Sequence, residues 1–238
     1  MWGNGDGPAP VLSVLMPVFN EAATVKRAIE QSLAVELGAP IELIVVDDGS
    51  SDGTSEVLRS FDGDPRLRIL AHERNMGKGA AVRTALEAAR GEFAAIFDAD
   101  LEYDPADLAR LLGPLRDGQA NVAMGVRTFG GYTSHSFAYV MGNKGVTLVA
   151  NILFNAYIRD LMTCHKMMRT ELFRSLPLRE PGFAIEAEIV ARLLERGERV
   201  YELPIHYRAR ASEAGKKLTW VDGLRVVRTL VRCRLFPR

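Results

Sequence analysis

Two carboxylates one residue apart are the first candidates for chemistry in this chain. Asp98 and Asp100 directly follow an apolar stretch over residues 93–97 that predicts a buried strand. The turn after that strand can aim both side chains, with Glu102 as a third oxygen donor, at one hard cation such as Mg²⁺ or Mn²⁺ shared with substrate phosphates. The alternative is a capped turn ahead of a helix starting near Pro105, because Asp is common in both roles.

Two other loops place polar residues after a strand or before a helix. Asp48 follows the apolar run 41–46, and its carboxylate could accept hydrogen bonds from a nucleobase or ribose, although Asp-Gly is also an ordinary turn sequence. Lys78 stands at an expected helix start, where it could favour an anion or be solvated. The segment is not the phosphate loop of nucleotide triphosphatases, because the first glycine of that motif is missing and Gly79-Ala80 follows the lysine.

The elements that must position these residues alternate along the first half of the chain. Apolar runs predict strands over 11–16, 41–46, 67–71 and 93–97, and helical periodicity covers 21–35 and 79–90. This order predicts an α/β fold whose mostly parallel sheet is covered by helices on both faces. Ligands of such folds bind beyond the carboxyl ends of the strands, where the polar residues above are expected.

The second half is patterned less regularly. We expect a loop over 127–134, an apolar helix over about 137–157, a helix over 184–196, a strand over 199–206 and a closing helix from about 219. No repeat or low-complexity linker interrupts the 238 residues, which are enough to bury one core. The predicted organisation is a loose leader (1–10), one domain (11–218) and a C-terminal helix (219–238).

Charge is distributed unevenly although the net charge is zero. Residues 1–158 hold 13 basic and 20 acidic side chains, and residues 208–238 hold nine Lys or Arg against Glu213 and Asp222. A basic end of this kind suits phosphates, nucleic acid or an anionic membrane surface. Nucleic acid is the weakest of these, because only Trp220 and Phe236 supply aromatic rings there.

The closing helix is amphipathic in its spacing. One face collects Trp220, Leu224, Val227, Val231 and Leu235, with Arg225, Arg228 and Arg232 along an adjoining edge. Such a helix can lie on an anionic membrane, or pack against the domain's own core or a second subunit, so peripheral membrane contact and a homodimer both stay open.

Compartment signals are few. The apolar uncharged stretch near the middle, 145–158, is shorter than a membrane span requires, and we therefore expect no transmembrane helix. The first ten residues lack the pattern of a signal peptide, so export is not expected. Two cysteines, Cys164 and Cys233, fit a reducing compartment, and Cys164 is expected in the core.

Taken together, these motifs resemble those of family 2 glycosyltransferases with the GT-A fold. The resemblance rests on PVFNE at 17–21, VDDGSSDGT at 46–54, NMGKG at 75–79 and DADLE at 98–102. Later segments are similar to the dolichyl-phosphate mannose synthase and polyprenyl-phosphate glycosyltransferase branch: GVR at 125–127, GNK at 142–144, TCHK at 163–166 and EAGKK at 213–217.

The resemblance implies roles for individual positions. Nucleotide-sugar contacts would come from Pro17, Phe19, Glu21, Val46, Asp48, Lys78, Asp98, Ala99 and Asp100. The metal would be held by Asp98, Asp100 and Glu102, and the catalytic set would be Asp98, Asp100, Arg127, Arg210 and Lys216, whose basic members hold phosphates.

The implied reaction is inverting, metal-dependent transfer of a hexose-type sugar from a GDP- or UDP-sugar to a polyprenyl or dolichyl phosphate at the cytoplasmic face of the membrane. A lipid phosphate is already ionised and needs cations rather than a strong base. A soluble hydroxylated acceptor is the alternative, with His165 or Asp160 as the base candidate. A nucleotide-sugar-binding module without turnover is a third possibility. Glu186 and Glu188 lie two positions apart on an expected helix, so at most one should serve the site.

Overall fold

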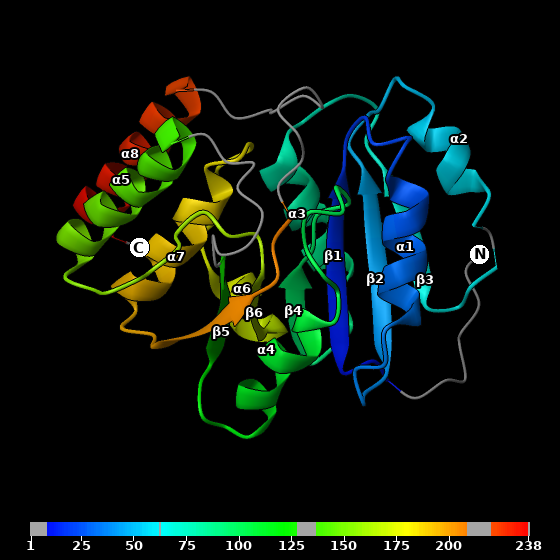
Figure 1. Ribbon diagram of the computed structural model, residues 1–238, viewed down its shortest axis with the longest axis horizontal. Coiled ribbons are helices and arrows are strands. Elements are labelled where there is room, and N and C mark those ends of the chain that lie inside the picture. Colours follow the sequence, from blue (N-terminus) through cyan, green and yellow to red (C-terminus); the bar gives the residue numbers. More distant parts are fainter. Residues whose placement is uncertain (1–8, 62, 128–136, 209–219, 238) are drawn as a thin grey trace.

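The computed structural model describes residues 9–61, 63–127, 137–208 and 220–237, and the expected leader lies almost wholly outside these ranges. A seven-stranded sheet with the order β3-β2-β1-β4-β6-β5-β7 forms the centre of the molecule (Figure 1). Its strands are β1 (Leu12–Val18), β2 (Ile41–Asp47), β3 (Leu67–Ala71), β4 (Phe93–Ile96), β5 (Val122–Arg127), β6 (Lys166–Arg169) and β7 (Val200–Ile205).

The sheet is mostly parallel, as the alternating pattern predicted. Strands β1, β2, β3 and β4 pair in parallel, and so do β5 and β7, whereas β6 runs antiparallel between β4 and β5. Strand β1 continues through Pro17, although proline cannot donate to a sheet ladder. The strand tolerates it because the pairing of β1 with β4 ends at Leu15 and Ile96, two residues before Pro17.

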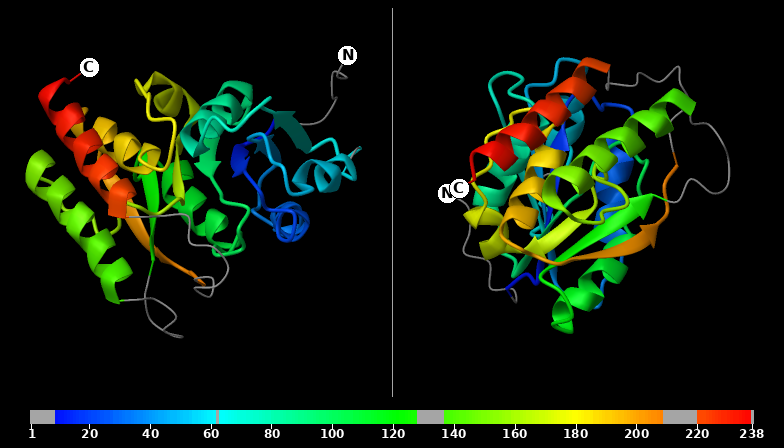
Figure 2. Two further views of the ribbon diagram at one scale, coloured as in Figure 1. Left: turned by 90° about the horizontal axis from the view of Figure 1, so that it is seen from above. Right: turned by 90° about the vertical axis from the view of Figure 1, so that its left-hand side faces the viewer.

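Helices cover both faces of the sheet. The helices are α1 (Val25–Ala34), α2 (Thr54–Arg59), α3 (Lys78–Ala88), α4 (Asp107–Arg116), α5 (Phe137–Phe154), α6 (Thr170–Ser175), α7 (Ile185–Glu195) and α8 (Trp220–Leu235). Figure 2 shows α1 and α4 on one face and α3 on the other. A Cβ on Gly79 at the start of α3 would lie 3.1 Å from the Ile185 side chain, so α3 and α7 touch at their N-terminal ends.

Helix α8 is part of the domain's packing. It lies beside α5 on the outer side of α7 (Figures 1 and 2), and its buried side consists of Val226, Thr229, Leu230 and Cys233. The apolar stripe expected from the spacing does not coincide with this buried side, because Leu224, Val231 and Leu235 are exposed to solvent. The helix therefore has apolar residues on two sides, of which one is covered by the domain.

Helix α5 extends N-terminally beyond the uncharged stretch 145–158. It begins at Phe137 and runs for 18 residues, with Lys144 inside it. By length and composition alone it could cross a membrane, and it is the one such helix in the part of the chain described. Its buried residues Thr147 and Ala150 face α7 and α8, so it lies along the domain.

Candidate active site

The loops that leave β1 and β2 are joined by hydrogen bonds between residues about thirty positions apart. The Asn20 amide donates to the Ser50 hydroxyl (2.9 Å), the Ser51 amide donates to the Asn20 side chain (2.9 Å), and the Glu21 amide donates to the Thr54 hydroxyl (2.9 Å). Asn20 takes a positive φ of 54°, which Asn tolerates better than most residues. These bonds delay helix α1 until Val25 and fix Glu21 at the carboxyl edge of the sheet.

Asp48 holds the loop before α3 rather than projecting freely from the edge. Its buried carboxylate accepts hydrogen bonds from the backbone amides of Met76 (2.9 Å) and Gly77 (2.7 Å) and lies 2.6 Å from Nδ1 of His72. Gly77 has φ +93°, and a Cβ there would lie 2.4 Å from the Pro181 carbonyl oxygen. The predicted contact of Asp48 with a nucleoside stays a prediction, since these partners use its carboxylate in the present structure.

Lys78 joins Asp98 to a buried carboxylate on α7. The Lys78 Nζ atom lies 2.8 Å from both carboxylate oxygens of Asp98 and 2.9 Å from Glu186 Oε1. Glu186 Oε2 in turn accepts a 2.5 Å hydrogen bond from the fully buried Lys166. Four alternating charges thus run from the carboxyl end of β4 into the core, and we call Asp98, Lys78, Glu186 and Lys166 the buried ion chain.

The pKa shifts in this chain follow from burial and neighbours. Burial alone would lower the pKa of Lys78, but the Asp98 and Glu186 carboxylates hold it well above its usual range. Burial would raise the pKa of Glu186, and Lys166 and Lys78 outweigh that and lower it. Both groups therefore remain charged at neutral pH.

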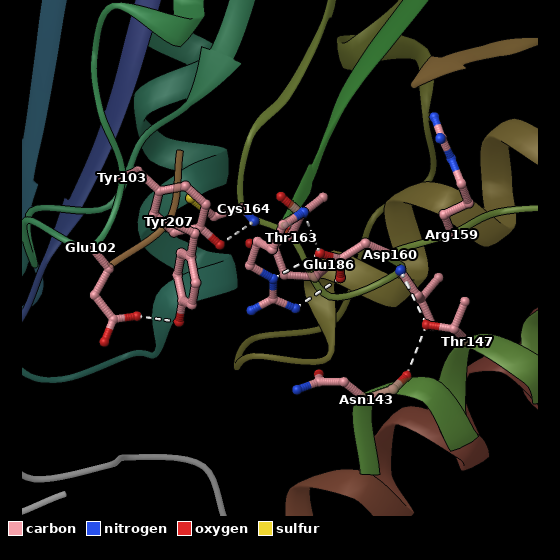
Figure 3. Close-up of polar contacts among 12 residues, drawn as sticks. Glu102, Tyr103, Asn143, Thr147, Arg159, Asp160, Thr163, Cys164, Glu186 and Tyr207 are labelled. Carbon is pink, nitrogen blue, oxygen red and sulfur yellow. Dashed lines mark hydrogen bonds and ion pairs between the residues drawn. The ribbon is translucent and has the colours of Figure 1, made fainter. Parts of the chain in front are cut away.

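The Asp-x-Asp turn does not gather its third expected carboxylate. The Glu102 amide donates to Asp100 Oδ1 (3.1 Å), but the Glu102 carboxylate turns toward β7 and accepts a hydrogen bond from the Tyr207 hydroxyl (Figure 3). Leu101 between them has φ +61°, a strained value for a branched side chain. Within the described ranges no three His, Cys, Asp or Glu side chains form a group that could hold a metal ion.

The remaining donor set still fits a hard divalent cation. Asp98 and Asp100 supply only oxygen ligands, and Mg²⁺ is usually bound through one or two carboxylates together with substrate phosphates. Asp100 is half-buried and Asp98 retains some exposure, so both side chains are accessible to a bound diphosphate. The geometry therefore supports a two-carboxylate site that a phosphorylated ligand completes.

Arg127 and Asp160 form a closed pair. The Arg127 guanidinium donates to both Asp160 oxygens (2.7 and 2.8 Å), and its backbone amide donates to the same carboxylate (3.1 Å). Both side chains are buried, and the guanidinium lies 5.1 Å from the centre of the Tyr207 ring. Figure 3 shows the Asp160 side of this pair. The phosphate-holding role expected for Arg127 and the base role considered for Asp160 both compete with this salt bridge.

His165 lies in the core. Its ring packs 4.5 Å from that of Tyr103 and 5.3 Å from that of Phe97, and neither ring nitrogen has a hydrogen-bond partner among the described residues. Burial lowers the pKa of His165 to about 3, so the imidazole is neutral at physiological pH. Cys164 is buried beside it, as expected, and its amide donates to the Tyr103 hydroxyl (3.2 Å, Figure 3).

Other predicted site residues divide into three groups. Val46 and Ala99 are buried, so only their backbone atoms could meet a ligand, whereas Pro17 and Phe19 are half-buried at the end of β1. Of the two glutamates on α7, Glu186 joins the buried ion chain, and Glu188 accepts from the amides of residues 179 and 180. Arg210 and Lys216 lie outside the described residues.

Sequence reasoning missed Lys166 and Tyr207, which the structure places around the Asp-x-Asp turn. Lys166 begins strand β6 inside the apolar stretch that ends at Met168, and a lysine in such a stretch is an anomaly that signals a buried partner. Beside Tyr207, Arg208 is exposed and lines a cavity of about 420 Å³ together with Glu102 and Arg27. Nothing in the local sequence linked Tyr207 to Glu102, more than a hundred residues earlier.

Several known glycosyltransferases are similar to this chain. The chain is 29% identical over 227 residues to the low-salt glycan biosynthesis hexosyltransferase Agl6 of Haloferax volcanii, covering 94% of this chain and 54% of that protein. It is 36% identical over 120 residues to the dodecaprenyl-phosphate galacturonate synthase of Rhizobium johnstonii, covering 49% of this chain and 36% of that protein. The chain thus spans about half the length of the first relative and about a third of the second.

Among solved structures, the fold is similar to glucosyl-3-phosphoglycerate synthase from Mycobacterium tuberculosis in complex with Mn²⁺, UDP and phosphoglyceric acid. The TM-score is 0.76 at 21% identity, over 96% of this chain and 80% of that one. Another structure of that enzyme holds Mg²⁺ and UDP (TM-score 0.74, 21% identity, 96% and 81% covered). The family described as Glycosyl transferase family 2 matches residues 13–177, and the chain belongs to that family.

Proposed function

We propose that this domain transfers a hexose-type sugar, with inversion, from a nucleoside diphosphate sugar to a polyprenyl phosphate, using Mg²⁺ or Mn²⁺ held by Asp98 and Asp100. The observation that carries the proposal is the meeting of three loops at the carboxyl edge of β1, β2 and β4 in a family 2 chain. Parallel sheets bind nucleotides at this edge. The UDP bound in the similar solved structures supports a nucleotide donor here.

The chain's own residues would bind and orient the donor. Glu21 and the loop anchored by Asp48 border the nucleotide, and Asp98 and Asp100 face its diphosphate. When bound, the divalent cation would offset the negative charge that develops on the departing nucleoside diphosphate. Lys78, held beside Asp98, adds a fixed positive charge near the same phosphates.

Among the described residues, neither base candidate is available to take a proton from a hydroxyl acceptor, which favours a phosphate acceptor. Of the two base candidates, His165 is buried and neutral with a pKa of about 3, and Asp160 is held by Arg127. An ionised phosphate needs no proton removed, only cations that bring it close to the donor. Arg208 is an exposed cation near the Asp-x-Asp turn, and Arg210 and Lys216 are further candidates. The name of the Rhizobium relative, a dodecaprenyl-phosphate galacturonate synthase, supports a lipid acceptor.

The outer faces of α5 and α8 would bring the domain to its lipid substrate. Helix α5 exposes Phe137 (78%), Met141, Leu148 and Ile152 (72%) at helical spacing, and α8 beside it exposes Leu224, Val231 and Leu235. Single exposed apolar residues are ordinary, but two adjacent apolar stripes indicate a contact surface.

The charges around these stripes favour an anionic bilayer over a second copy of the chain. Helix α8 exposes Arg225, Arg228 and Arg234, α5 exposes Lys144, and the one acidic residue of the two helices is Asp222. A two-fold contact between copies would set these cations against each other. Each basic residue near an anionic surface adds about 1 kcal/mol of attraction. Peripheral attachment at the cytoplasmic face is the localisation that follows from this part of the proposal.

The test follows nucleoside diphosphate release from a panel of GDP- and UDP-sugars with Mg²⁺ or Mn²⁺, with and without polyprenyl phosphate in anionic vesicles. We expect release that needs one donor and the lipid together, and Asp100→Asn should lower it by about a thousandfold, the effect of removing several kcal/mol of charge stabilisation. Release with a soluble acceptor alone would replace the lipid half of the proposal. A nucleotide-binding module would bind the donor and release nothing.

Glu92→Gln is the matched control for Asp100→Asn. Glu92 precedes β4, and its exposed carboxylate pairs with Arg169 at the start of that strand. Asp98 and Asp100 follow the other end of β4. Its loss should leave turnover unchanged. Equal losses in the two variants would show that Asp100 acts through general stability rather than at the reacting phosphates.

A further inference from the structure

The buried ion chain contains two charges that the proposed reaction does not use. Lys166 is fully buried and Glu186 nearly so, at a cost that is offset only when each charge has a close partner. They come from different elements, β6 and α7, and meet behind Lys78 rather than at the edge where a diphosphate would lie. Their place in the buried ion chain suggests that they act on Lys78, which Glu186 contacts directly.

Lys78 is shared unequally between two carboxylates. Its Nζ lies 2.8 Å from both Asp98 oxygens and makes a hydrogen bond there, whereas its 2.9 Å approach to Glu186 Oε1 lacks hydrogen-bond geometry. Lys166 occupies the other Glu186 oxygen at 2.5 Å. Lys166 therefore competes for Glu186, and Glu186 competes with Asp98 for Lys78.

This competition bears on metal binding. A carboxylate with an ammonium within 2.8 Å of both oxygens must release part of that contact before it can ligate a cation. The stronger the pull of Glu186 on Lys78, the more easily Asp98 is released. Charges at these separations interact by more than 1 kcal/mol even at the effective dielectric of a protein surface, which corresponds to roughly tenfold in a binding constant.

We propose that Glu186 and Lys166 are positioning residues that set how firmly Lys78 holds Asp98, and thereby how readily Asp98 turns to a divalent cation. The inference rests on the proposed function in that it assumes a metal at Asp98 and Asp100. It is independent of which sugar is transferred and which acceptor receives it.

The experiment measures Mn²⁺ binding directly, by electron paramagnetic resonance of free Mn²⁺ with UDP or GDP present, on the whole chain. Glu186→Gln leaves Lys78 to Asp98 alone and should raise the Mn²⁺ dissociation constant about tenfold. Lys166→Met frees Glu186 to draw Lys78 away from Asp98 and should lower the Mn²⁺ dissociation constant severalfold. Glu186→Asp keeps the charge and should fall between the unmodified protein and Glu186→Gln.

Glu188→Gln is the matched control, because Glu188 is equally buried two residues along α7 but binds the amides of residues 179 and 180 and the Arg232 side chain. It should lower the midpoint of thermal unfolding and leave Mn²⁺ binding unchanged. Mn²⁺ binding that weakens in both Glu186→Gln and Lys166→Met, or changes in neither, would overturn the inference.

Two further outcomes separate this inference from the proposed function. If Glu186→Gln does not fold, Lys166→Met decides, since the positioning role predicts tighter Mn²⁺ binding whereas a purely structural role of Lys166 predicts weaker or unchanged binding. An unmodified chain that binds no Mn²⁺ with either nucleotide would overturn the proposed function and this inference together, whereas normal Mn²⁺ binding with insensitive variants would overturn only the inference.

Discussion

Buried carboxylates from the two halves of the molecule can be satisfied in different ways. Between β1 and β4, Asp48 accepts hydrogen bonds from backbone amides of a neighbouring loop. From β5 onward, Asp160 and Glu186 are held by the buried cations Arg127 and Lys166. The first half shapes loops around the proposed donor, and the second half fixes side chains around the proposed reacting groups.

The difference has an energetic consequence. A carboxylate bound to backbone amides can lose its charge and keep part of its hydrogen bonding, whereas a buried ion pair that loses one member leaves an uncompensated charge. We therefore expect the buried ion pairs of the second half to be sensitive to charge-changing substitutions, and the following predictions measure that sensitivity.

Asp160→Asn should produce the largest loss of stability. It removes the counter-charge of Arg127, whose side chain is 3% exposed, and breaking a buried pair in this way costs about 3–5 kcal/mol. Urea unfolding followed by circular dichroism measures the free energy of unfolding directly.

The neighbouring residue supplies the control. Arg159 pairs with Glu202 at 3.0 Å, but its side chain is 46% exposed, so Arg159→Ala should cost about 1 kcal/mol or less (Figure 3 shows both positions). Similar losses in the two variants would remove the distinction between buried and exposed ion pairs, because an exposed pair would then matter as much as a buried one.

The first half of the fold could be predicted from the sequence more fully than the second half. The strands and helices of the first half have continuous apolar runs and local turn residues, and the structure confirms their order. The antiparallel insertion of β6 between β4 and β5 left no local trace, since a four-residue strand has too little periodicity to be recognised.

Some residues of the candidate site could be predicted from the local sequence, and others could not. Asp98 and Asp100 could be found because both stand in one tripeptide after a strand. The partners of Arg127 and Glu102 could not, because Asp160 and Tyr207 reach them only through the packing of distant elements. The outward stripe on α8 was visible in its spacing, but which side the domain covers depends on the position of α7.

His165→Phe should change how stability depends on pH. Burial lowers the pKa of His165 to about 3 from an ordinary value of 6.5, so between these values the unfolded chain binds one proton more than the folded one. This group's contribution is complete above pH 6.5 and is lost as the pH falls, by about 1.4 kcal/mol per pH unit. The phenylalanine variant should lack that part of the slope in urea unfolding between pH 6 and pH 4.5.

The same variant has a second expected result at pH 7. Both imidazole nitrogens are buried without partners between aromatic rings, so a phenyl ring should leave the stability unchanged or raise it by about 1 kcal/mol. A slope equal to that of the unmodified protein would mean that the imidazole takes up its proton alike in the folded and the unfolded chain, and His165, with an ordinary pKa, would then return as a base candidate.

The smallest effects should separate the two sides of α8. Arg232 lies 2.7 Å from Glu180 and 2.9 Å from the fully buried Glu188, so Arg232→Ala should cost about 1–2 kcal/mol by leaving a buried carboxylate without its cation. Arg225 pairs with Asp222 at the surface, and Arg225→Ala should cost about 0.5 kcal/mol or less. Urea unfolding in the absence of lipid compares them. A loss in Arg225→Ala as large as in Arg232→Ala would mean that the outer side of α8 is packed against protein, and a bilayer would then not be its partner.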